Sequence, residues 1–475
     1  MLFSSMTFIS IFLPLVCGIY LLAKKEFHNM ILLIASIIFY AWEEPRFLAI
    51  MLLTILVNYF GAIWVNKWVK YRKILLFLTI VANLSFLIYF KYFNFIIQNI
   101  NNLGGHISTL DIVMPIGISF YTFQALSYVI DVYRGECKVQ KDIYKLALYI
   151  CLFPQLIAGP IVKYHDISEQ IDNRDVSFEK VIYGVKRFVF GLSKKVLIAN
   201  TMGLVADKIF SQSPDMFSTP IAWLGAICYS LQLFFDFSGY SDMAIGLGSI
   251  FGFKFLENFN YPYISKSITE FWRRWHISLS SWFKQYVYIS LGGNRGGKCK
   301  TVRNLGIVFL LTGIWHGAAW NFVFWGIWHG MFIIFEKLIN IKELEPKLNM
   351  LWQKILMHIY CILVFVIGWV MFRADNLHYG GKYILNMFGL GVGVNINNTY
   401  PLLYYFNGQE LIVFVIAILC CTPIFKNIKL YTSETETLKQ KCKGALINTF
   451  MILLFILSIS SIASATYNPF IYFRF

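Results

Sequence analysis

Long apolar runs alternate with short polar loops along the whole chain. A helix needs ~20 residues to cross a bilayer, and runs near that length lie at 7–23, 46–66, 74–99, 112–133, 142–162, 219–252, 304–336, 355–372, 409–425 and 444–465. A shorter run lies at 29–42, and basic residues interrupt the run at 180–210. The pattern predicts an all-α polytopic membrane protein with about eleven transmembrane helices and with re-entrant or interfacial helices between 160 and 300.

Composition and charge distribution agree with a membrane protein. Hydrophobic residues make up 58% of the chain and charged residues 14%. The formal net charge of +16 does not indicate nucleic-acid binding, because lysine and arginine gather in short loops such as 67–73, 134–145 and 295–303. The positive-inside rule places these loops in the cytoplasm, and it predicts that both chain termini are extracellular. The first run lacks a small-residue cleavage site, which indicates an anchor helix and not a signal peptide.

The region 229–330 carries polar groups that lipid-facing helices do not tolerate. Charged and imidazole side chains at bilayer depth cost a few kcal/mol each unless they face a cavity or a partner. Two apolar blocks in this region nevertheless contain Asp236, Arg273, Arg274, His276, His316 and His329. We therefore expect the functional site here.

Two helices carry polar residues at helical spacing. One begins at Ile118 and the other covers 219–252. Such a stripe indicates either hydrogen bonds that join helices or the wall of a water-accessible cavity. The residues concerned are Tyr121, Gln124, Tyr128 and Asp131 in the first helix, and Tyr229, Gln232, Asp236 and Tyr240 in the second.

The segment 263–286 is amphipathic and allows two interpretations. Its tryptophans, Trp272, Trp275 and Trp282, are typical of anchors at the membrane interface. Alternatively, Arg273 and Arg274 bind a polyanionic donor such as the phosphates of coenzyme A.

His316 follows Arg303 by thirteen residues, which places it roughly 20 Å deeper along a helix. A neutral buried histidine can accept a proton from a hydroxyl. The alternative is a core histidine that bonds a backbone carbonyl. His329 lies thirteen residues further on, which is not the spacing of a helical metal pair, so no metal site is expected.

Several motifs resemble the membrane-bound O-acyltransferase superfamily, and within it the bacterial alginate O-acetyltransferase-like branch. They are PIGISFYTFQALSYVIDVYRG, FPQLIAGPIVKY, FFDFSGYSDMAIG, TEFWRRWHISLSSWF, LGGNRGG, WHGAAWNFVFWG, GWVMFRA and FIYFRF. The resemblance implies that His316 is the catalytic histidine and His276 a second site residue. It also implies a cytoplasmic and an extracellular funnel that meet at His316. Gln232, Asp236, Tyr240, Trp315 and Asn321 are then expected to line the cavity.

The resemblance further implies the reaction. An acetyl group passes from cytosolic acetyl-CoA, with no bound cofactor, across the bacterial cell membrane for O-acetylation of a cell-surface or secreted polysaccharide, such as an alginate-like exopolysaccharide or peptidoglycan. An exported SGNH-type partner is implied as well. The alternatives are D-alanyl or other acyl transfer to teichoic acid, and a proton-coupled transporter or flippase.

The chain ends in an aromatic tail, FIYFRF, whose one hydroxyl belongs to Tyr472. We expect Tyr472 to be the transient acyl acceptor; the alternative is that the tail only seals the terminus against the membrane interface. The chain is expected to be one membrane-embedded unit with three parts. These are an N-terminal bundle at 1–107, a catalytic core at 108–373 and a C-terminal extension at 374–475.

Overall fold

The computed structural model describes residues 1–344, 350–391, 401–425, 438–464 and 467–469. Regular structure in this part of the chain is entirely helical. Six helical stretches among the described residues are long and apolar enough to cross a membrane, which makes the chain a multi-pass membrane protein. They are Pro45–Lys67, Val69–Asn102, Phe178–Phe210, Thr219–Ile250, Leu351–Arg373 and Gly444–Ser464. Two shorter apolar helices cover Phe8–Leu22 and Gly408–Cys420. The expected number of about eleven spans stays a prediction.

The described helices fall into two compact units. The first unit contains Met1–Leu192, Tyr240–Leu256 and Leu430–Ser464. In it α3 packs against α4 and α6, and α2 packs against α7. Its helices are α1 (Leu13–Leu22), α2 (His28–Glu43), α3 (Leu48–Lys67), α4 (Arg72–Leu87), α5 (Phe93–Asn102), α6 (Ile118–Arg134), α7 (Ile143–Cys151), α8 (Phe153–Leu156), α9 (Tyr164–Asp172), α10 (Phe178–Ser193) and α22 (Leu438–Ser464).

The second unit contains Ser193–Gly239, Glu257–Lys429 and Ala465–Phe475. It therefore holds both histidines of the predicted site. A π-helical segment, Lys194–Ala199, leads into its first α-helix. Its helices are α11 (Asn200–Phe210), the first part of α12 (Thr219–Ile250), α13 (Ile268–Arg274), α14 (Ile277–Trp282), α15 (Gly297–His316), α16 (Trp320–Leu338), α17 (Ile341–Leu344), α18 (Leu351–Arg373), α19 (Leu377–Met387), α20 (Leu402–Tyr405) and α21 (Gly408–Cys420).

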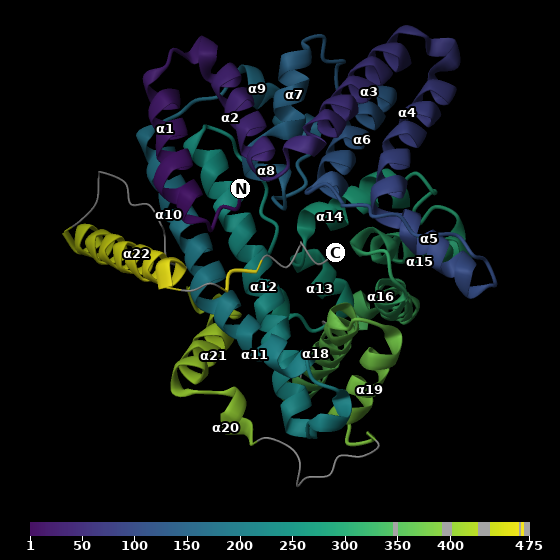
Figure 1. Ribbon diagram of the computed structural model, residues 1–475, viewed down its shortest axis with the longest axis vertical. Coiled ribbons are helices and arrows are strands. Elements are labelled where there is room, and N and C mark those ends of the chain that lie inside the picture. The colour runs from purple at the N-terminus through teal and green to yellow at the C-terminus, as the bar shows by residue number, and fades with distance from the viewer. Residues whose placement is uncertain (345–349, 392–400, 426–437, 465–466, 470–475) are drawn as a thin grey trace. The chain divides into compact units, whose positions relative to one another are not determined.

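The apolar run 304–336, predicted as one span, is two helices. α15 ends at His316 and α16 begins at Trp320, and the backbone between them is extended at Gly317 (φ −163°) and Ala319 (φ −154°). The two helices then pack closely together (Figure 1). Glycine permits this approach: a Cβ added at Gly313 would lie 2.5 Å from the Phe322 carbonyl oxygen. The break places His316 at the end of a helix and not in the middle of one.

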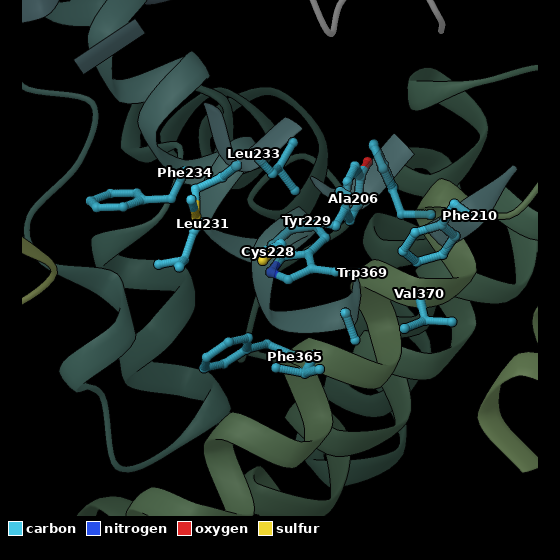
Figure 2. Packing of buried hydrophobic residues seen from close by; sticks show 14 of the residues in the cluster. Ala206, Phe210, Cys228, Tyr229, Leu231, Leu233, Phe234, Phe365, Trp369 and Val370 are labelled. Carbon is cyan, nitrogen blue, oxygen red and sulfur yellow. The ribbon is translucent and has the colours of Figure 1, made fainter. Parts of the chain in front are cut away.

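Aromatic and aliphatic side chains from α11, α12 and α18 form the core of the second unit (Figure 2). Phe210 on α11 stacks on Tyr383 of α19 with ring centroids 4.4 Å apart. Trp369 on α18 is buried beside Trp275 at 4.9 Å. Burial of large aromatic side chains contributes most of the packing energy of such a core. This core joins the helices that carry the candidate site.

A buried carboxylate fixes the start of α13. Glu336 on α16 accepts hydrogen bonds from the backbone N–H groups of Ile268 at 2.6 Å and Thr269 at 2.7 Å. It also accepts one from the Tyr360 hydroxyl at 3.1 Å. The first N–H groups of a helix have no partner within the helix, and a carboxylate suits both their hydrogen-bonding capacity and the helix dipole. Glu336 thereby positions the segment that leads to His276.

Candidate functional site

His276 lies at the junction of α13 and α14 in a backbone conformation that residues other than glycine rarely adopt. Its backbone is left-handed, with φ 44° and ψ 55°, and the residue is 1% exposed. Left-handed backbone in a residue other than glycine costs free energy, and such strain often marks functional positions. The turn directs the imidazole into the protein interior, where its ring meets the edge of Phe237 at 4.6 Å.

Asn258 determines which nitrogen of His276 carries the proton. Its side-chain oxygen accepts from the Ser278 backbone N–H at 3.1 Å and from the Ser278 hydroxyl at 2.9 Å. An amide atom that accepts a backbone N–H must be the oxygen, so Nδ1 of His276, 3.2 Å away, must donate to it. In the neutral imidazole Nε2 is then unprotonated.

Nε2 of His276 is buried and has no hydrogen-bond partner among the residues that the structure describes. Burial lowers the pKa of His276 below its ordinary value, because desolvation disfavours the charged form. The side chain therefore presents a bare acceptor nitrogen inside the protein. A nitrogen held unprotonated in this way can accept a hydrogen bond from a neighbouring group of the site.

His316 is partly exposed and is surrounded by aromatic rings. Its ring centroid lies 4.9 Å from Trp315, 4.9 Å from Trp325 and 5.1 Å from Phe372. Trp315 also lies 6.3 Å from the His276 ring. The structure thus brings the two predicted histidines to the same tryptophan, although they are 40 residues apart in the sequence.

His329 lies next to this group but is enclosed. Trp325 lies between His329 and His316. The His329 ring centroid is 5.0 Å from that of Trp325 and 5.3 Å from that of Trp272. A Cβ added at Gly368 would lie 2.5 Å from the His329 Nε2 atom.

The interpretation of three tryptophans as membrane-interface anchors is wrong, because all are buried: Trp272 is 8% exposed, Trp275 4% and Trp282 5%.

The two arginines of α13 differ in their surroundings. Arg274 forms an ion pair with Glu270 at 2.8 Å and donates to the Asn260 carbonyl at 3.1 Å. Arg273 is exposed, and no ion pair joins it to another described residue. Arg273 is therefore the more accessible cation for an anionic ligand.

The residues expected to line a cavity make contacts with different parts of the protein. Asp236 forms an ion pair with Lys195 at 2.8 Å, and both side chains are buried. Asn321 donates to the Ala374 carbonyl at 2.7 Å, which ties α16 to the end of α18. Tyr240 belongs to the first unit, where it stacks on Phe3 at 4.6 Å. Gln232 is buried near Gly203.

Comparison with known proteins identifies the chain. Residues 142–373 match the family model for MBOAT, the membrane-bound O-acyltransferase family. The probable alginate O-acetylase AlgI of Pseudomonas syringae pv. tomato is 46% identical over 82% of this chain and 76% of its own length. That of Pseudomonas putida is 40% identical over the full length of both chains. The chain belongs to the membrane-bound O-acyltransferase family. A peptidoglycan O-acetyltransferase of Helicobacter pylori is 36% identical over 83% of the chain and 81% of its own length.

The predicted membership of the alginate O-acetyltransferase-like branch is therefore confirmed, and the protein is an O-acyltransferase. Teichoic acid D-alanyltransferases match less than half of this MBOAT chain. The D-alanyl alternative is therefore not favoured.

Two residues of this MBOAT site were not found from the sequence. Asn258 lies in an irregular segment 18 residues from His276, where no periodicity marks it. Lys195 stood out only as an interruption of an apolar run. The sequence nevertheless offered a clue to Lys195, because a buried aspartate such as Asp236 requires a cationic partner.

One group in the first unit has the composition of a metal site. Asp131, Glu136 and His165 bring possible ligand atoms within 4.8 Å of one another. Nδ1 of His165, however, contacts Asp131 at 2.8 Å, and its Nε2 contacts Asp166 at 3.3 Å. These carboxylates raise the pKa of His165 to about 9. Both ring nitrogens then carry protons at neutral pH, so His165 forms ion pairs and offers no lone pair to a metal.

Proposed function

We propose that this MBOAT enzyme moves an acetyl group from cytosolic acetyl-CoA across the bilayer to a hydroxyl on the outer side. The transfer serves O-acetylation of a cell-surface or secreted polysaccharide, either an alginate-like exopolysaccharide or peptidoglycan. Relatives in Pseudomonas and Helicobacter are named as an alginate O-acetylase and a peptidoglycan O-acetyltransferase, which supports the acetyl group and the polysaccharide. The observation that carries the proposal is the meeting of His276 and His316 at Trp315.

His316 is the base that takes the proton of the incoming hydroxyl. The family resemblance assigns this role to His316, and the partial exposure of His316 beside Trp315 and Phe372 supports the assignment. His276 has two possible duties, namely polarising the thioester carbonyl or holding His316 in place. A neutral His276 with bare Nε2 cannot donate a hydrogen bond to a carbonyl. The geometry therefore favours the second duty, in which His276 accepts a hydrogen bond within the site.

The donor approaches from the cytoplasmic side, where Arg273 and Arg274 bind its phosphates. A guanidinium binds phosphate in a bidentate geometry that an ammonium cannot match. Because Arg274 already pairs with Glu270, Arg273 makes the larger contribution. Gln232, Asp236, Tyr240, Trp315 and Asn321 are proposed to line the passage between donor and acceptor.

Tyr472, which lies outside the described residues, is the proposed transient acceptor. Its phenol oxygen forms a bond to the acetyl carbon while the carbon–sulfur bond of the thioester breaks. The phenol proton passes to His316 and then to the departing thiolate, so that coenzyme A leaves as a thiol. The acetyl ester next passes to a hydroxyl of an exported SGNH-type partner, and this second transfer restores the phenol.

The proposed architecture has about eleven transmembrane helices, re-entrant or interfacial helices, and two funnels that meet at His316. The three-part division at 107/108 and 373/374 belongs to this proposal. The protein lies in the bacterial cell membrane, and both termini are extracellular.

A proton-coupled transporter or flippase is the rival function, in which Asp236, His276 and His316 relay protons. The ion pair of Asp236 with Lys195 speaks against this relay, because the carboxylate already has a cationic partner. A transporter also leaves the thioester of acetyl-CoA intact.

The test is incubation of purified full-length protein with [1-14C]acetyl-CoA. Label should appear on the C-terminal peptide, located by mass spectrometry on Tyr472, and coenzyme A should be released in equal amount. Tyr472→Phe keeps the apolar tail and removes the oxygen, so it should lose the label. Normal polymer acetylation by Tyr472→Phe contradicts the relay, and an intact thioester contradicts the enzyme itself.

A further inference from the structure

The last described residues of the chain are bound by polar side chains of the second unit. The Tyr467 hydroxyl donates to Asp207 on α11 at 2.5 Å. Asn200, the first residue of α11, donates to the Asn468 side-chain oxygen at 3.3 Å. The Lys195 ammonium donates to the Pro469 carbonyl oxygen. Three consecutive tail residues therefore have a hydrogen-bond partner on one short stretch, 195–207.

Lys195 uses the tail to complete its hydrogen bonds. An ammonium has three donors. Asp236 forms an ion pair with this ammonium at 2.8 Å, the Asn200 side-chain oxygen accepts a hydrogen bond at 2.9 Å, and the Pro469 carbonyl accepts another. Lys195 is 3% exposed, so water does not replace a lost acceptor easily. A buried charge with an unused donor is costly, and the bound tail removes that cost.

The surface that receives Tyr467 is shaped for it. Asp207 is held by Arg373 at 2.6 Å, so its carboxylate is oriented before it meets the tyrosine hydroxyl. Gly203 lies one helical turn away, and a Cβ there would come within 3.0 Å of the Tyr467 oxygen and 2.6 Å of the Gln232 amide nitrogen. A glycine therefore makes the space in which the tyrosine lies.

Two contacts connect this binding surface to His316. Arg373, which holds Asp207, directly follows Phe372 in the chain, and the Phe372 ring packs 5.1 Å from the His316 ring. Tyr472 follows Tyr467 by five positions, and an extended chain of that length reaches at most ~17 Å. The point of attachment therefore limits how far the end of the tail can travel from the site.

We propose that Lys195, Asn200 and Asp207 form a tail clamp that binds Tyr467–Pro469 and sets the reach of the chain end toward His316. The proposal rests on the proposed role of Tyr472 as acyl acceptor. The clamp residues are positioning residues, because they act on the tail and not on the reacting atoms. Without the clamp the end of the chain samples a larger volume, and the effective concentration of its hydroxyl at the site falls.

Binding of the tail is tested without any reference to catalysis. Asn468→Cys in the full-length protein provides a thiol, and its reaction with a water-soluble maleimide is followed by mass spectrometry of the C-terminal peptide. Because the chain has nine native cysteines, the labelled peptide must be identified by its mass. Loss of one hydrogen bond to a charged group costs enough to shift the bound fraction about tenfold or more. Tyr467→Phe and Asp207→Asn should therefore each raise the labelling rate about tenfold.

Two substitutions serve as matched controls. Lys208 follows Asp207 on α11 but bonds the Tyr404 carbonyl at 2.6 Å, so Lys208→Met removes a nearby charge without touching the tail. Tyr379 donates its hydroxyl to the Phe210 carbonyl at 2.7 Å, so Tyr379→Phe is the control for loss of a hydroxyl. Both should label at the parental rate. Equal rates in the clamp variants and the controls would overturn the clamp.

The catalytic consequence is measured separately on proteins that retain Asn468. Tyr467→Phe should lower kcat for acetylation of the C-terminal peptide about tenfold and leave the KM for acetyl-CoA unchanged, since the donor site is intact. Lys195→Met leaves Asp236 buried without its cation and is the variant most exposed to misfolding; Tyr467→Phe avoids that problem. If labelling rises but kcat stays parental, the tail is bound without serving transfer. If Tyr472→Phe is fully active while labelling still depends on Asp207, the clamp stands and the acyl relay fails.

Discussion

Asn258→Leu is the most informative substitution of the site, because it removes one acceptor oxygen without changing either histidine. That oxygen accepts three donors: the backbone N–H and hydroxyl of Ser278, and Nδ1 of His276. Leucine has a similar size and can accept none of them. The Ser278 hydroxyl can rotate to another acceptor, but the backbone N–H and the imidazole N–H cannot.

The expected loss follows from this count. The buried backbone N–H is left without a partner, which should lower the free energy of unfolding by about 1–3 kcal/mol. The imidazole N–H keeps only the Ser278 hydroxyl oxygen, 3.4 Å from Nδ1, which adds a smaller loss. The imidazole is also free to exchange its proton to Nε2, which converts the acceptor atom into a donor. A misoriented His276 no longer holds His316 in place, and loss of a positioned base lowers the rate by ~10²–10⁴-fold. We expect a decrease in kcat within that range and a lower unfolding temperature in detergent.

Asn258→Asp separates the chemical effect from a packing effect. Its carboxylate keeps an acceptor for the same donors, so it should retain far more activity than Asn258→Leu. Ser278→Ala removes one of the three bonds and leaves His276 held by Asn258, so its rate should stay within a few-fold of the parent. Release of coenzyme A from acetyl-CoA by purified protein gives the rate, and thermal unfolding gives the stability. Parental kcat in Asn258→Leu would refute the tautomer assignment.

Three further predictions concern other parts of the protein. His316→Ala should abolish acetyl transfer while the protein still inserts in the membrane; transfer at the normal rate, measured with labelled acetyl-CoA, would show that His316 is not the base. Arg273→Gln should raise the KM for acetyl-CoA more than Arg274→Gln does, because Arg274 is paired with Glu270; an effect on kcat alone would place these arginines outside the donor site. His165, on α9 outside the candidate spans, has a pKa raised to about 9 by Asp131 and Asp166. Its contribution to stability is therefore complete below the unfolded pKa of about 6.5 and is lost as the pH rises through about 9. His165→Gln should remove that pH dependence from the unfolding temperature, and an unchanged profile would contradict the ion pairs.

Candidate spans such as Pro45–Lys67 and Thr219–Ile250 were predictable because hydropathy and length determine them. The end of α15 was not, because Gly317, Ala318 and Ala319 are as apolar as their neighbours and the break depends on backbone angles. Close packing of Gly313 against α16 becomes possible only after the turn forms. Hydropathy alone therefore indicated one helix where there are two.

The candidate site was predictable in part. His276 and His316 stood out as imidazoles in apolar sequence and matched motifs of the family, but their orientation depends on Asn258 and Trp315, which no spacing rule identifies. Asp236 stood out as a carboxylate in an apolar run, but its ion pair with Lys195 could not be predicted. Pairs separated by 41 residues are set by tertiary packing, which a single sequence does not display.

The glycine contact between α15 and α16 restricts motion during turnover. Backbones that touch without intervening side chains leave no layer of rotamers that can rearrange, so the two helices move as one body. His316 at the end of one helix and Trp325 on the other keep a fixed separation as a result. Motion in the catalytic cycle must then occur outside this pair of helices. Slow hydrogen exchange across 305–330 would be the dynamic signature of such a rigid pair.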